Sequence, residues 1–155
     1  MTHVPQEVLS YLSEQMTVTL ATASPAGEPH ASTFMYVNDG TTIYVWARTT
    51  SKTAQQLQSN PRVSFAIDEY VPDWNKAKGI QGSGECATVA AGDELAETIG
   101  RFADKFPSPN SGASTANIAF FKIVPAELQF IDNAGTNIRL ADAEFGASFH
   151  RRQVL

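Results

Sequence analysis

Residues 43–67 read IYVWARTTSKTAQQLQSNPRVSFAI, and this stretch decides how the rest of the chain is interpreted. Its pattern predicts a strand, three hydroxyl residues followed by Lys52, a short helix that ends at Asn60 and Pro61, and a second strand. The first N–H groups of a helix have no partners within the helix, and the helix dipole favours an anion at that end. The segment therefore predicts an anion site, suited to a phosphate group, between a strand and a helix.

The same residues also fit a simpler interpretation. Thr49 or Thr50 would cap the helix by accepting a hydrogen bond from a backbone N–H, and the Lys52 side chain would point into solvent. The segment is not a P-loop, because no glycine-rich loop precedes the lysine. The residues alone leave the phosphate site and the ordinary helix cap open.

The composition is that of an ordinary globular protein. The chain has 155 residues, of which 43% are hydrophobic and 17% charged, and we expect a single domain over residues 1–155. Cys86 is the only cysteine, which excludes a disulfide framework and a cysteine metal cage. The three histidines, His3, His30 and His150, lack the spacing of metal ligands, so no metal site is expected.

Charge and hydropathy also limit the partners of the chain. The formal net charge is −5, which disfavours general binding to nucleic acid or to an anionic membrane surface. The first residues contain no continuous apolar run, so no signal peptide is expected. No stretch approaches the roughly 20 apolar residues that span a bilayer. We therefore expect a cytoplasmic protein without a membrane segment.

Periodicity predicts a mainly β chain with flanking helices. Alternating β-rich runs are separated by turn residues, and the helix expected near residue 93 has Asp93 as its N-cap and an apolar stripe of Leu95, Ile99, Phe102 and Phe106. We expect strands at about 17–23, 29–37, 41–48, 61–68, 78–90 and 117–131, the last bent near Pro125, and helices at about 5–15, 50–59 and 93–105. Six largely antiparallel strands with apolar faces favour a small closed barrel, which leaves no sheet edge exposed. The tail, 133–155, has no clear pattern.

Four segments in a fixed order resemble a known family. They are 20–30 (LATASPAGEPH), the stretch 43–67, 79–87 (GIQGSGECA) and 121–133 (FKIVPAELQFIDN). Together they resemble the pyridoxamine 5'-phosphate oxidase-like, FMN-binding split-barrel family over about residues 10–133. The resemblance implies a six-stranded antiparallel split barrel that forms a homodimer, with FMN bound at the interface and a small molecule as substrate.

The resemblance also implies which residues hold the cofactor. Ser51 and Lys52, with Thr50 beside them, match the positions that bind the FMN phosphate. Residues His30 to Met35 match the strand along the ribityl chain and ring, where Ser32, Thr33 and Phe34 would act largely through backbone groups. Val45 and Trp46 match the neighbouring strand that borders the flavin. Gln81 would donate to a flavin carbonyl or ring nitrogen; otherwise it is a surface amide at a bend of the barrel.

Some residues depart from the family pattern. His30 and Ser51 stand where arginines are common, so the phosphate charge would rest on Lys52, with Arg48 as the second candidate cation. The C-terminal Trp and Arg pattern of pyridoxamine phosphate oxidases is not recognisable in 133–155. The sequence therefore points to a family relative that acts on another small molecule.

Several functions remain compatible with these residues. The first is an FMN-dependent oxidoreductase, for which no side chain stands out as a catalytic acid, base or nucleophile. The second is a haem-binding or haem-degrading split barrel with His30 or His150 as the axial ligand. The third is a flavin-binding module without turnover, and a deazaflavin in place of FMN would use the same phosphate site.

Overall fold

The computed structural model describes residues 3–107, 115–134 and 151–155. Its helices are α1 (Gln6–Glu14), α2 (Lys52–Ser59) and α3 (Asp93–Lys105), with a 3₁₀ turn η1 (Trp74–Lys76). Its strands are β1 (Thr17–Ala23), β2 (Pro29–Asp39), β3 (Thr42–Arg48), β4 (Arg62–Asp68), β5 (Lys78–Thr88), β6 (Ile118–Asp132) and β7 (Arg151–Gln153). The three helices among the described residues are the expected ones, and none is long and apolar enough to cross a membrane.

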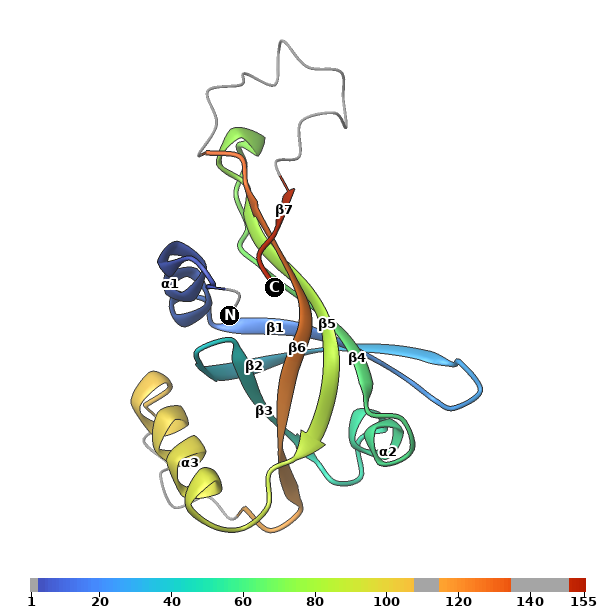
Figure 1. Cartoon of the computed structure of the whole chain (residues 1–155). Coiled ribbons are helices and arrows are strands. Elements are labelled where there is room, and N and C mark those ends of the chain that lie inside the picture. Colours follow the sequence, from blue (N-terminus) through green and yellow to red (C-terminus); the bar gives the residue numbers. More distant parts are fainter. Residues whose placement is uncertain (1–2, 108–114, 135–150) are drawn as a thin grey trace.

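Six antiparallel strands close into a barrel, as expected. The strand order is β3-β2-β1-β4-β5-β6, and the pairing of β3 with β6 closes the ring. In Figure 1 the long strands β5 and β6 run the length of the molecule, whereas β1 and β2 cross them nearly at right angles. The closing pair joins residues 43–48 to residues 118–123, which are far apart in the sequence.

The barrel interior is filled by alternate residues of its strands. Val18, Leu20 and Phe65 are among the buried side chains, which follows from the period of two in a strand with one buried face. Helix α1 closes one end, where Val8 and Leu12 are fully buried in the same cluster. Each such side chain contributes about 1.5–3 kcal/mol on full burial, so α1 is an integral part of the core.

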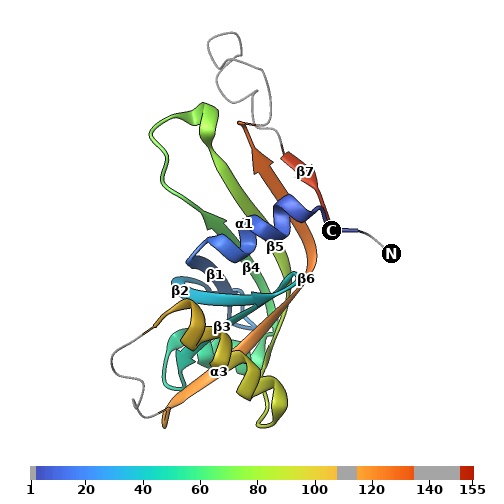
Figure 2. The same cartoon turned by 90° about the vertical axis from the view of Figure 1, so that its left-hand side faces the viewer.

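Helix α3 covers the outside of the barrel with a second apolar cluster. In Figure 2 it lies beside β3 and the lower part of β6, and its Leu95, Phe102 and Phe106 pack against Tyr44 and Phe120 among others. Two expectations were wrong here. Ile99 is 42% exposed, because it lies at the edge of the apolar stripe. Asp93 is the first helical residue rather than the cap; Gly92 precedes it at φ +141°, a conformation that suits glycine.

The glycines of β5 allow a close approach of strands. A Cβ on Gly82 would lie 2.8 Å from the backbone carbonyl oxygen of Glu127 and would also collide with the Phe65 ring. A Cβ on Gly84 would collide with the backbone carbonyl of Val124. The register of β5 and β6 shifts between Ser83 and Gly84, opposite Pro125. The expected bend near Pro125 is therefore a β-bulge, and the glycines are required by neighbouring backbone and side chains.

The end of the tail adds a strand that the sequence pattern did not predict. Strand β7 pairs with β6, with Gln153 opposite Gln129, and Val154 is buried in the barrel core. The pattern gave no signal because Arg151, Arg152 and Gln153 lack apolar alternation.

Candidate functional site

A cleft opens where two neighbouring strands separate. Strand β2 pairs with β1 from Pro29 to Met35 but pairs with β3 only from Tyr36 onward. Beyond Tyr36 and its partner Val45, β3 follows β6 while β2 continues along β1. The β3-facing edge of residues 30–35 therefore lies outside the β2–β3 ladder, and its backbone groups face the gap.

Side chains from both strands and from the start of α2 line this cleft. Its volume is about 360 Å³, within the range of about 300–1,000 Å³ typical of small-molecule sites. Apolar and polar groups both contribute to the lining, which consists of His30, Ser32, Thr33, Phe34, Met35, Trp46, Ala47, Arg48, Ser51 and Thr53. Such a mixture suits a ligand with an aromatic part and a polar or charged part.

The polar end of the cleft is the N-terminus of α2. Ser51 is the N-cap, and its hydroxyl oxygen accepts a hydrogen bond from the backbone N–H of Ala54 at 3.1 Å. Neither Thr49 nor Thr50 is the cap, so that expectation was wrong. The Thr49 backbone N–H and hydroxyl both donate to the Asn117 carbonyl, and a turn in which the Ser51 N–H donates to the Arg48 carbonyl brings the Ser51 hydroxyl into the capping position.

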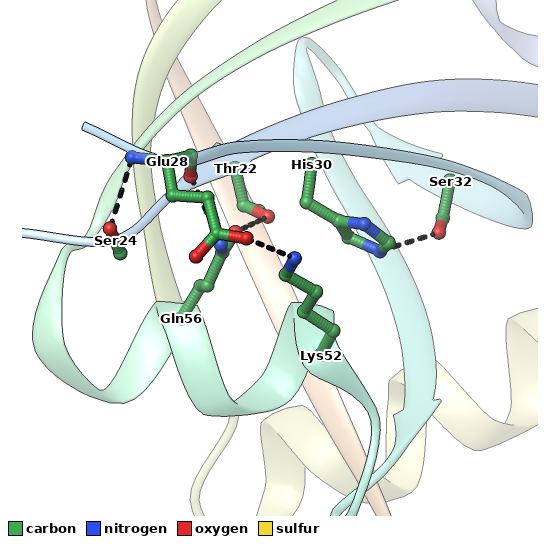
Figure 3. Close-up of polar contacts among 7 residues, drawn as sticks. All are labelled: Thr22, Ser24, Glu28, His30, Ser32, Lys52 and Gln56. Atoms are coloured by element: carbon green, nitrogen blue, oxygen red, sulfur yellow. Dashed lines mark hydrogen bonds and ion pairs between the residues drawn. The ribbon is translucent and has the colours of Figure 1, made fainter. Parts of the chain in front are cut away.

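Lys52, the first residue of α2, forms an ion pair across the cleft rim. Its Nζ donates to the Glu28 carboxylate at 2.7 Å, and both side chains are partly exposed, at 46% and 65%. The hydrogen bond and charge of Lys52 lower the pKa of the Glu28 carboxyl, with a smaller contribution from His30. Figure 3 shows the Lys52 side chain rising from α2 to meet Glu28, with His30 and Ser32 further along β2.

The β1–β2 turn that carries Glu28 is fixed to α2 by a second set of contacts. Gln56 donates to the Glu28 carbonyl at 3.1 Å and accepts from the buried Thr22 hydroxyl at 2.6 Å. The Glu28 N–H donates to the Ser24 hydroxyl at 3.0 Å. The backbone of Glu28 is therefore held on both sides, as Figure 3 shows, and its carboxylate is directed toward Lys52.

The structure brings together most of the residues singled out from the sequence. His30, Ser32, Thr33, Phe34, Trp46 and Ser51 line the cleft. Thr50 and Lys52 flank Ser51 in the sequence. A hydrogen bond of 3.0 Å joins His30 Nε2 to Ser32 Oγ.

Two of the singled-out residues lie elsewhere. The Val45 side chain is fully buried in the barrel core, because it points to the opposite face of β3 from Trp46. Gln81 lies on the outer face of the sheet, in a separate hollow with Thr19, Ala66 and Gln129 among others. Neither side chain lines the cleft.

Sequence reasoning missed Glu28, Ala47 and Thr53. Ala47 and Thr53 line the cleft, and Glu28 pairs with Lys52 at its rim. The nearest available signal for Glu28 was its place two residues before His30 in the first hairpin. Its pairing depends on the docking of that hairpin on α2, which local patterns do not report.

The sequence matches a known family along most of its length. The model of the family described as Pyridoxamine 5'-phosphate oxidase matches residues 4–132. The chain belongs to this family. The match includes both strands of the cleft, the start of α2 and the Glu28 turn. Among curated proteins, no sequence matches the chain.

Solved structures of similar fold carry different functional descriptions. HutZ, the haem storage protein of Vibrio cholerae, matches with a TM-score of 0.70 and 21% identity over 81% of this chain and 93% of its own. A conserved hypothetical protein of Mycobacterium tuberculosis matches with a TM-score of 0.73 and 22% identity over 88% of this chain and 91% of its own. A candidate pyridoxamine 5'-phosphate oxidase of Listeria innocua matches with a TM-score of 0.65 and 18% identity over 81% and 95%. At these identities the likeness supports the split-barrel fold and not a particular ligand.

Proposed function

We propose that the protein binds FMN in the cleft between β2 and β3 and acts as an oxidoreductase on a small molecule. One observation carries the proposal: in a chain of this family, a cationic and hydroxyl-rich helix start lies at one end of a cleft that also has an apolar lining. A phosphorylated cofactor with an aromatic ring system requires this combination.

The phosphate end of the site consists of Lys52, Ser51 and the dipole of α2. The ammonium supplies the main positive charge, the Ser51 hydroxyl remains able to donate while its oxygen caps the helix, and Arg48 adds a second cation to the lining. These donors suit a phosphate monoester, which carries a charge of about −1.5 to −2 at pH 7. Glu28 is the one carboxylate paired with this group among the described residues.

The rest of the cleft suits the ring and the sugar chain. Phe34, Met35 and Trp46 provide apolar surface for an aromatic ring, and Met35 is 45% exposed in the chain by itself. The free edge of residues 30–35 offers backbone donors and acceptors, and the Ser32 hydroxyl and His30 ring offer side-chain partners. These residues would bind and orient the cofactor.

Bound FMN would supply the hydride transfer, and the protein would supply binding, orientation and electrostatics. We assign no catalytic residue to the chain. The role of the cleft residues is to hold the ring with one face open to a small-molecule substrate.

We propose further that two copies of the chain pair through the outer face of the sheet. This face carries small side chains around a hollow of about 490 Å³, including Thr19, Ala21, Ser64, Ala66 and Gln81. Small side chains allow two sheets to approach closely, and the family pattern expects a dimer with the cofactor at the interface. Gln81 would then belong to the interface.

The test is a flavin titration of the purified protein. We expect flavin absorbance on purification or saturable quenching of FMN fluorescence on titration, and mass spectrometry of the released ligand distinguishes FMN from a deazaflavin. The absence of both co-purified flavin and FMN binding would reject the proposal. Reduction of bound flavin by NADH or NADPH with an electron acceptor present separates an enzyme from a flavin-binding module without turnover.

Haem is the second candidate ligand, because a histidine that could act as an axial ligand lies in the cleft. His30 lines the cleft, and the similar fold of HutZ belongs to a haem storage protein. The other candidate axial ligand, His150, lies outside the described residues. A Soret band on titration with haem, lost in His30→Ala, would favour this function; a band that survives replacement of both histidines by alanine would reject these ligands.

A further inference from the structure

The ammonium expected to hold a phosphate already has an anionic partner within the chain. Lys52 Nζ lies 2.7 Å from the Glu28 carboxylate, which is a normal distance for a charge-assisted hydrogen bond. Glu28 is also two residues from His30, and its partner Lys52 directly follows Ser51 at the start of α2. A carboxylate oxygen therefore occupies one of the positions from which an anion would bind Lys52.

The placement of this carboxylate is determined by the fold. Gly27 adopts φ +86° in the turn before Glu28, and its N–H donates to the Ser24 carbonyl at 2.9 Å. The Ser24 hydroxyl and the Gln56 side chain then bind the N–H and the carbonyl of Glu28. Because both backbone groups of Glu28 are held, its side chain begins from a fixed point opposite the start of α2. The position of the carboxylate near Lys52 therefore follows from the backbone hydrogen bonds of this turn.

We propose that Glu28 is an internal competitor for Lys52, and that it thereby sets how tightly the cleft holds a phosphate-bearing ligand. The inference rests on the proposed function, because it assumes that the phosphate of FMN binds at Lys52. Binding of the phosphate requires the Glu28 carboxylate to leave the ammonium or to share it at the cost of repulsion between like charges. Glu28 weakens the binding of phosphorylated ligands and leaves ligands without a phosphate unaffected.

A carboxylate in this position has a functional consequence. With Arg absent at positions 30 and 51, the site already has fewer cations than the family pattern, and Glu28 neutralises one of those that remain. The ligand is therefore held reversibly, and the Glu28–Lys52 pair re-forms when it leaves.

The test compares Glu28→Gln with the unmodified chain in titrations with FMN and with riboflavin, which lacks the phosphate. The amide keeps the shape of the side chain and can still accept from Lys52, but it carries no charge. Exposed ion pairs contribute little because water and salt screen them, so we expect FMN to bind only about two- to fivefold more tightly to Glu28→Gln. Riboflavin affinity stays unchanged, and the FMN gain decreases as salt concentration rises.

Asp39→Asn is the matched control. Asp39 forms an exposed ion pair with Arg101 at 3.2 Å, and its side chain is 63% exposed, close to the 65% of Glu28. The substitution removes the same unit of negative charge at the far end of β2, so FMN affinity should not change. A second control is Glu28→Gln in a Lys52→Ala background, where most of the gain disappears if Glu28 acts by competing for the ammonium.

Each outcome is decisive. Unchanged or weaker FMN binding by Glu28→Gln overturns the inference while leaving the proposed function intact. An equal gain in Asp39→Asn, in riboflavin binding or in the Lys52→Ala background also overturns it, because the effect would then be one of overall charge or of folding. If neither the unmodified chain nor Glu28→Gln binds FMN, the proposed function fails and the inference fails with it.

Discussion

At the scale of single residues, the charge of Lys52 is the most direct determinant of phosphate binding. Its ammonium is the cation at the start of α2 and donates to Glu28 when no ligand competes. Hydrogen bonds to charged groups are worth about 1.5–3 kcal/mol, so Lys52→Ala should weaken FMN binding by that amount. Because Lys52 is 46% exposed, we expect the lower part of the range. FMN titration by fluorescence quenching measures the loss.

Lys122→Ala serves as the control for Lys52→Ala. Lys122 is also paired with a carboxylate, that of Glu94 at 3.0 Å, but it lies on the α3 side of the barrel. Its replacement should leave FMN affinity unchanged. If Lys52→Ala binds FMN as tightly as the unmodified chain, the phosphate is held elsewhere and the assignment of this end of the cleft is wrong.

The sequence predicted individual site residues where their positions follow from strand alternation or from the family pattern. Six of them line the cleft. Val45 was included because of the family pattern, although the alternation of Tyr44, Val45 and Trp46 already places Val45 opposite Trp46. Glu28 was missed because its contact with Lys52 joins residues 24 positions apart and depends on the Gln56 bridge.

At the scale of elements, the start of α2 links stability to binding. Ser51 caps the helix and also faces the cleft. Ser51→Ala should lower the free energy of unfolding by about 0.5–2 kcal/mol, the usual cost of losing such a cap. Ser51→Asp should retain the cap but place a negative charge at the phosphate end, so stability is kept while FMN binding weakens. Urea denaturation and FMN titration of both variants separate the two effects.

Two results would contradict these roles of Ser51 in binding and in stability. If Ser51→Asp binds FMN as tightly as the unmodified chain, the phosphate does not approach the helix start. If Ser51→Ala unfolds at the same urea concentration as the unmodified chain, the Ser51–Ala54 bond contributes nothing to stability. A comparison with Ser59→Ala, at the other end of the same helix, controls for the loss of a serine hydroxyl.

Periodicity was sufficient to locate the expected elements but not their caps. The expected ends of the six barrel strands and three helices fall within two residues of those observed. The cap of α2 was misassigned because the Asn117 carbonyl, from a distant loop, binds Thr49. Strand β7 is formed by pairing with β6 alone, and its three exposed polar residues carry no strand pattern.

At the scale of the whole molecule, the barrel should lose stability in alkaline solution. Tyr11 and Tyr36 donate hydrogen bonds to the carbonyls of Lys78 and Leu12, and burial is the main cause that raises the pKa of both phenols. Above about pH 10 the unfolded state loses these protons while the folded state keeps them. Stability is therefore fully present below pH 10 and falls above it, by up to about 1.4 kcal/mol per pH unit for each phenol.

Urea denaturation between pH 8 and about pH 11 tests this dependence. Tyr36→Phe should show a shallower decline above pH 10, because only Tyr11 of the two then remains. Its stability at pH 8 should also be lower, since the hydrogen bond to Leu12 is lost. A slope above pH 10 that does not change in Tyr36→Phe would mean that this phenol is not the group that titrates.

Barrel closure is the feature that local sequence patterns predict least. The β3–β6 pairing joins residues far apart in the chain, and the six strands alone would also allow an open sheet. The strand pattern favoured a closed barrel because closure leaves no sheet edge exposed, and the resemblance of four ordered segments supported the same prediction. The separation of β2 from β3, which creates the cleft, is equally non-local: residues 43–45 of β3 pair with both β2 and β6, whereas residues 46–48 pair with β6 and leave β2.

The proposed dimer is the last consequence at this scale. Ser64 lies exposed on β4 in the outer hollow, between Ala21 of β1 and Ser83 of β5. In a monomer, Ser64→Arg should change the free energy of unfolding by no more than about 0.5 kcal/mol, as surface substitutions usually do. In a dimer paired through this face, a long charged side chain would be buried without a partner and would separate the subunits. Light scattering at micromolar concentration measures the change.

Ala103→Arg is the control for Ser64→Arg, because it adds the same charge at an exposed position on α3, away from the outer face of the sheet. We expect Ala103→Arg to remain dimeric and Ser64→Arg to become monomeric. Because the cleft would be completed by the partner, Ser64→Arg should also bind FMN more weakly, although none of its cleft residues has changed. A monomeric unmodified chain that binds FMN would contradict the dimer and would show that one copy of the β2–β3 cleft is sufficient.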